Sequence, residues 1–176
     1  MTTAVLNNIV KQFGGEVWKQ IVRHLGPPID TRAFHITQWL SGEESSELLH
    51  GGGALPFIPI EEIWLWADQD IEKRAWYLAS FVPNILFREE AKVCLARELL
   101  VRYGAREDVR RNLISNFSSE GWVGPSSLHY QRKKQYLIEF LKGEDNENVK
   151  RWISEYVSLL EERITSSNLE EEREGF

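Results

Sequence analysis

The stretch Asn146–Ile164, NENVKRWISEYVSLLEERI, indicates the fold class. Its apolar residues recur at the i, i+3, i+4, i+7, i+8 and i+11 positions that form one face of an α-helix. They are Val149, Trp152, Ile153, Tyr156, Val157 and Leu160. We expect Trp152, Ile153, Tyr156 and Leu160 to be buried against a helix at 126–141, chiefly through Tyr130, Leu137 and Leu141.

The same periodicity extends outward from this stretch over most of the chain. No segment of useful length alternates with the period of two that is typical of a β-strand. The sequence therefore predicts an all-α domain of about nine helices over 1–164, with a Gly-rich loop at 41–57. Within this loop, residues 41–55 should be the most protease-sensitive internal segment. We expect 165–176 to be a disordered acidic tail. The helices preceding the last one are expected at 4–13, 16–25, 30–40, 59–67, 70–82, 89–103, 107–117 and 126–141.

An internal repeat is visible at the start of every second helix. An acidic or amide residue comes first, and a basic residue lies in the first turn, as in Asp30-Thr31-Arg32 and Glu107-Asp108-Val109-Arg110-Arg111. The marker arginines are spaced by 42, 37 and 40 residues; they are Arg32, Arg74, Arg111 and Arg151.

This pattern resembles HEAT repeats, which are helix pairs of about 40–47 residues. The resemblance is clearest at Asp108-Val109-Arg110 and covers roughly 15–163. It implies a right-handed stack of antiparallel helix pairs, an α-solenoid, that binds other macromolecules along a concave face. A weaker resemblance, carried by Gly121-Trp122-Val123-Gly124-Pro125 with His129-Tyr130, is to helical-repeat regions of bacterial signalling or defence ATPases.

The net charge of −6 is unevenly distributed. Residues 88–134 carry ten basic and six acidic side chains, for +4, whereas 135–176 carry five basic and eleven acidic ones, for −6. A nucleic-acid-binding domain usually has a basic balance throughout. Because Cys94 is the only cysteine, no intrachain disulfide can form. With no signal segment and no long apolar run, we expect a cytoplasmic protein without a membrane partner.

The residues that could carry chemistry do not form a recognisable catalytic or metal-binding motif. The four histidines are not spaced as metal ligands; they are His24, His35, His50 and His129. His50-Gly51-Gly52-Gly53 resembles an oxyanion loop, but the nucleophile elbow that such a loop requires is absent. We therefore expect no catalytic residues, no metal and no cofactor.

A basic and aromatic cluster is the candidate binding site. Cations and rings together suit an acidic peptide, a phosphate or a nucleic-acid backbone. The predicted partner-binding residues are Arg110, Arg111, Trp122, His129, Tyr130, Arg132 and Lys133. The alternative is a solvated face on which arginines pair with neighbouring glutamates and Trp122 is a buried loop anchor.

Two functions from different classes follow. The first is a non-enzymatic scaffold or adaptor that binds a protein partner with an acidic surface. The second is an enzyme of the DNA glycosylase type on a HEAT-like fold, which would need a dense basic groove for DNA. The net charge of −6 favours the scaffold and makes nucleic acid the less suitable partner.

Overall fold

The structure is a computed structural model that describes residues 3–26, 30–42, 53–84, 94–119, 121 and 123–174. These residues form eight α-helices and two short 3-10 helices, and they contain no strand, so the predicted all-α class is confirmed. The elements are α1 (Thr3–Ile21), η1 (Val22–His24), α2 (Thr31–Ser41), η2 (Leu55–Phe57), α3 (Ile60–Asp68), α4 (Ile71–Ala79), α5 (Leu95–Tyr103), α6 (Glu107–Phe117), α7 (Ser126–Leu141) and α8 (Glu147–Glu174).

The difference from the predicted nine helices lies in α1. The two helices expected at 4–13 and 16–25 are continuous, with a kink at Phe13, whose φ of −130° and ψ of 35° are not helical. Gly14 follows the kink, and a Cβ atom there would overlap the carbonyl oxygen of Phe57 in η2. The glycine therefore allows η2 to pack closely against α1.

The predicted loop at 41–57 is only partly within the described residues, since 43–52 lie outside them. Its last residues are not a solvated connector. Ala54 and Leu55 are fully buried, and the Ala54 N–H donates to the carbonyl oxygen of Trp39. The end of this segment is therefore part of the core.

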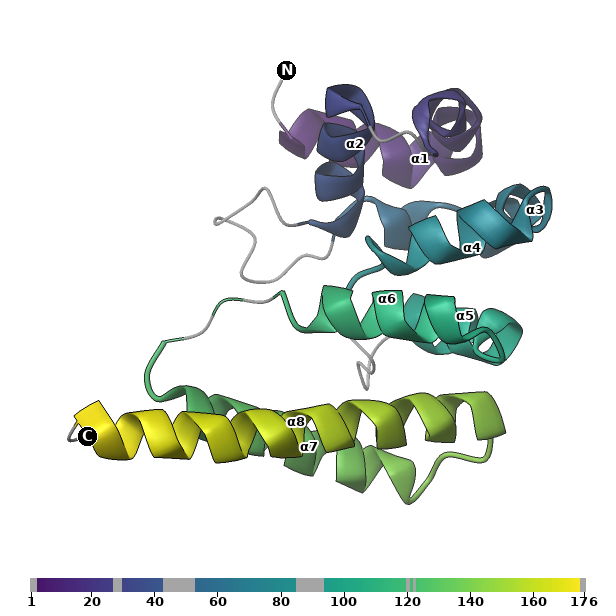
Figure 1. Ribbon diagram of the computed structural model, residues 1–176. Helices are drawn as coiled ribbons and strands as arrows, with labels where there is room; N and C mark the ends of the chain where they lie inside the picture. Colours follow the sequence, from purple (N-terminus) through teal and green to yellow (C-terminus); the bar gives the residue numbers. More distant parts are fainter. Residues whose placement is uncertain are drawn as a thin grey trace.

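The helices follow one another along the molecule from α1 and α2 at one end to α7 and α8 at the other (Figure 1). α3 contacts α4, α4 contacts α6, and both α5 and α7 contact α8. One connected set of buried side chains runs from Val10 in α1 to Leu160 in α8. The described helices at the two ends of the molecule are therefore linked through one continuous core.

Side chains of α6 attach it to α4. Asn112 Nδ2 donates to the Trp76 carbonyl oxygen at 2.6 Å, and Asn116 Nδ2 donates to the Val82 carbonyl oxygen at 2.8 Å. These bonds use carbonyl groups near the end of α4 that have no acceptor role within the helix. They fix the position of α6 along α4.

The aromatic core of α8 confirms the predicted burial against α7 and adds α6 as a second partner. Trp152 and Tyr156 are fully buried, and Leu137 of α7 is also buried. However, both rings pack on Phe117 of α6, with centroid distances of 5.2 and 6.5 Å. Trp152 Nε1 donates to the Arg110 carbonyl oxygen at 3.2 Å. The apolar face of α8 is wide enough to cover α6 as well as α7.

The predicted disordered tail is wrong for residues 165–174, which continue α8 to Glu174. Glu171 accepts hydrogen bonds from the Ser127 hydroxyl at 2.6 Å and the Ser127 N–H at 3.1 Å. These bonds lower the pKa of the Glu171 carboxyl. The carboxylate thus caps the N-terminus of α7, where negative charge is favourable, and holds the end of α8 in place.

Candidate functional site

The seven predicted partner-binding residues do not form one surface. Arg110 is buried between helices, whereas the Arg111 side chain is 77% exposed. Trp122 lies outside the described residues. The other four belong to α7; they are His129, Tyr130, Arg132 and Lys133.

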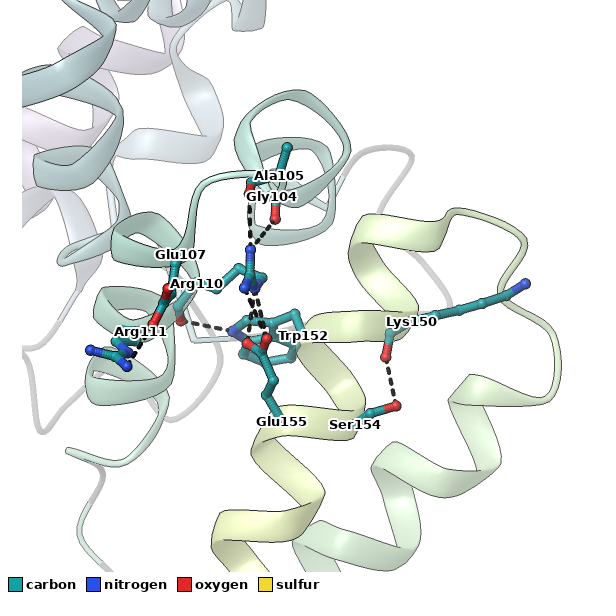
Figure 2. Close-up of polar contacts among 9 residues, drawn as sticks. All are labelled: Gly104, Ala105, Glu107, Arg110, Arg111, Lys150, Trp152, Ser154 and Glu155. Carbon is teal, nitrogen blue, oxygen red and sulfur yellow. Dashed lines mark hydrogen bonds and ion pairs between the residues drawn. The ribbon is translucent and has the colours of Figure 1, made fainter.

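Arg110 lies at the centre of the contact between α6 and α8 (Figure 2). Its guanidinium donates to the Glu155 carboxylate through bonds of 2.9 Å. The same group also donates to the carbonyl oxygens of Gly104 and Ala105, at 2.8 and 3.1 Å. The guanidinium thereby joins α8 to the turn that precedes α6.

The predicted exposure of Arg110 is therefore wrong. The residue is 6% exposed, because α8 covers the side of α6 that carries it. A buried charge is tolerated when it is paired and hydrogen-bonded, and removing one partner destabilises the fold. We conclude that Arg110 holds the helices together and is not available to a partner.

Arg111 projects away from this cluster (Figure 2) and pairs with Glu107 at 2.5 Å, one helical turn earlier. It lines a hollow of about 540 Å³ between α4 and α6, together with Trp76, Glu107, Asp108, Asn112 and Ser115. Its charge is matched by the two acidic residues of the same hollow. This surface has no strong preference for either sign of charge.

A second hollow lies beside α7 and collects three of the predicted residues. We call it the α7 hollow; its volume is about 330 Å³, and it is lined by Asn84, Phe117, His129, Arg132, Lys133, Tyr136 and Leu137. His129, Arg132, Lys133 and Tyr136 occupy positions i, i+3, i+4 and i+7, so they share one face of α7. None of the described residues that line the α7 hollow is acidic.

Lys133 is held in place within the α7 hollow. Its Nζ donates to the carbonyl oxygen of Phe117, the last residue of α6, and lies 5.5 Å from the centre of the Tyr156 ring. The hydrogen bond and the cation–π contact place the ammonium group at the junction of three helices. Arg132 is exposed and has no ion-pair partner among the described residues.

Tyr130 does not line the α7 hollow. Its ring packs against the core and lies 5.7 Å from the guanidinium of Arg163 in α8. His129 contacts the same ring edge-to-face, with a centroid distance of 5.5 Å. Tyr130 therefore packs against the core and against the His129 ring, and it does not contribute to the hollow itself.

Three cations of the basic segment 88–134 pair with the acidic segment that follows it. Arg97 binds Glu144 at 2.8 Å, Arg110 binds Glu155 at 2.9 Å, and Lys134 binds Glu161 at 2.9 Å. The Glu144 side chain is 1% exposed, and this burial opposes ionisation of its carboxyl. The hydrogen bonds from Arg97 and from the Asn146 N–H outweigh the effect of burial and lower the pKa of Glu144. These three ion pairs attach α8 and the turn before it to the preceding helices.

Two polar lining residues, Tyr136 and Asn84, were not among the predicted site residues. Tyr136 lies one helical turn after Arg132 and Lys133, so the helical spacing contained the signal that could have identified it. Asn84 follows α4 and reaches the α7 hollow through the tertiary structure alone. No local pattern in the sequence connects Asn84 with α7.

Among the described residues, other potentially reactive groups show no comparable clustering. Cys94 is half-buried, and burial raises the pKa of its thiol, which disfavours the reactive thiolate. Within the described ranges, no three His, Cys, Asp or Glu residues come together as metal ligands.

Comparison with known proteins finds no family model that matches the chain, no similar curated protein and no similar solved structure. Among the helices that the structure describes, none combines the length and apolar character needed to cross a bilayer.

Proposed function

We propose that this chain is a non-enzymatic interaction module, a stack of HEAT-like helix pairs that binds an acidic segment of a partner protein at the α7 hollow. The observation that carries this proposal is the convergence of Arg132, Lys133 and His129 in one hollow whose described lining lacks a carboxylate. Cations arranged in this way attract a negatively charged partner and select against a positively charged one.

The arrangement of the helices supports a scaffold. Successive helices bury their faces against neighbours along the molecule, as in repeat proteins that offer extended binding surfaces (Figure 1). The right-handed, antiparallel solenoid expected from the sequence belongs to this proposal. A protein partner is preferred to duplex DNA because Arg110 and Lys134 are already paired, and the net charge is −6.

The test compares two exposed arginines. Binding of short acidic, neutral and basic peptides is measured by isothermal titration calorimetry for the full chain and for Arg132→Glu and Arg111→Glu. We expect the acidic peptide to bind best, Arg132→Glu to weaken it at least about tenfold, and the matched control Arg111→Glu to leave it unchanged.

If Arg132→Glu and Arg111→Glu weakened binding of the acidic peptide equally, a binding site at the α7 hollow would be contradicted. Duplex DNA is titrated in parallel at two salt concentrations. Tight DNA binding that weakens steeply with salt would overturn the scaffold and favour a nucleic-acid-binding enzyme.

A further inference from the structure

We propose that the group bound in the α7 hollow is the phosphate monoester of a phosphorylated side chain on a partner protein. This inference rests on the proposed function, since it takes the α7 hollow as the binding surface. It adds the chemical class of the ligand, which a preference for acidic segments alone does not specify.

The donors in the α7 hollow suit an oxyanion with more than two oxygens. Arg132 offers a planar fork of N–H groups, Lys133 an ammonium, Asn84 an amide and Tyr136 a phenol, while His129 adds a ring nitrogen. A carboxylate has two oxygens and a single charge. A phosphorylated side chain has three acceptor oxygens and about −1.5 to −2 charges near neutral pH, so it can accept hydrogen bonds from more of these groups at once.

The surroundings increase the strength of such contacts. Phe117 and Leu137, both almost fully buried, form the apolar part of the lining. Charge–charge attraction is stronger beside an apolar wall than in open water. Because the Phe117 carbonyl and the Tyr156 ring already hold the Lys133 ammonium, little side-chain freedom is lost on binding.

The size and isolation of the α7 hollow favour a single phosphate group over a polyanion. Its volume of about 330 Å³ is at the small end of the range for ligand sites. The neighbouring cation Lys134 is paired with Glu161, so the charge does not continue along α7 as a track for a nucleic-acid backbone. A phosphorylated side chain needs only the local cluster and is less affected by the net charge of −6.

The experiment uses the full chain and three glycine-flanked peptides that differ at one position: phosphoserine, glutamate or serine. Calorimetry at about pH 7.5 keeps the phosphate mainly dianionic. We expect the phosphoserine peptide to bind about tenfold or more tightly than the glutamate peptide, with no measurable binding of the serine peptide. Inorganic phosphate should compete with the phosphopeptide.

Two variants test the contacts without disturbing Lys133. Arg132→Glu should abolish the preference for phosphoserine, and Tyr136→Phe should weaken phosphopeptide binding by about threefold, as expected for the loss of one hydrogen bond. Arg111→Glu is the matched control and should have no effect, since Arg111 lines the other hollow.

The outcomes separate this inference from the proposed function. Equal binding of the phosphoserine and glutamate peptides would overturn the phosphate assignment and leave the acidic-partner site standing. Absence of binding by both peptides would overturn the site itself. A single-stranded oligonucleotide or an anionic vesicle that binds more tightly than the phosphopeptide would replace the phosphorylated side chain with a polyanion.

Discussion

The contact between α6 and α8 and the α7 hollow each contain an arginine of the basic segment 88–134, yet the two regions differ in what surrounds that arginine. Arg110 is enclosed, with the Glu155 carboxylate and two backbone carbonyls as partners. Arg132 is exposed, and the described lining of its hollow contributes no carboxylate. A basic run in a helical sequence therefore contributes either a buried structural ion pair or an exposed charge, depending on whether another helix covers it.

The largest expected effect comes from breaking the contact between α6 and α8 at its aromatic centre. Trp152→Ala removes a fully buried ring that packs on Phe117 and donates to the Arg110 carbonyl oxygen. We expect a loss of about 3–5 kcal/mol in the free energy of unfolding, measured by chemical denaturation. A loss below about 1 kcal/mol would mean that α8 is not packed on α6 as described.

A second substitution distinguishes the clamp from an exposed ion pair. Arg110→Ala leaves Glu155 without its partner and should lower the free energy of unfolding by about 2–3 kcal/mol, somewhat less than for a fully buried pair because Glu155 is partly exposed. The neighbouring Arg111→Ala is the control and should change it by less than about 0.5 kcal/mol. Similar losses for both variants would contradict the difference between the two arginines.

The pH dependence of stability tests the ion pair between Arg97 and Glu144, which lies just before the N-terminus of α8. The folded pKa of Glu144 lies below its unfolded value of about 4.3, so this carboxylate stabilises the fold above that pH, and the contribution is lost as the pH falls through the folded pKa. Glu144→Gln should cost about 1–2 kcal/mol at neutral pH. The variant should also show a weaker loss of stability on acidification than the unmodified protein. An identical acid profile for both would exclude Glu144 as a contributor.

The smallest expected effect is local and concerns the last turns of α8. Glu171→Ala removes the carboxylate that accepts bonds from Ser127. Amide hydrogen exchange should become faster over 165–174 and at the start of α7, with no change in the denaturation midpoint. Unchanged protection at both places would show that this cap does not hold the end of α8.

Local patterns predicted the fold better than they predicted the site. The bounds of α6 and α7 agree with the expected 107–117 and 126–141, because periodicity and flanking breaks lie within a few residues of each helix. The burial of Arg110 depends on α8, more than 40 residues away in sequence, and the position of Asn84 depends on the packing of α4 against α6. The cap formed by Glu171 is equally remote from Ser127. Contacts between segments that are distant in the sequence leave no periodic pattern in it, so they could not be predicted from the sequence.

Binding at the α7 hollow can be tested directly by an NMR titration of the labelled full chain with an acidic or phosphorylated peptide, followed through the backbone amides. We predict shifts confined to Asn84, the end of α6 and the α7 residues 129–137, with none around Trp76 and Arg111. Shifts centred on Trp76 and Arg111, or the absence of any shift at saturating peptide, would contradict the assignment of binding to the α7 hollow.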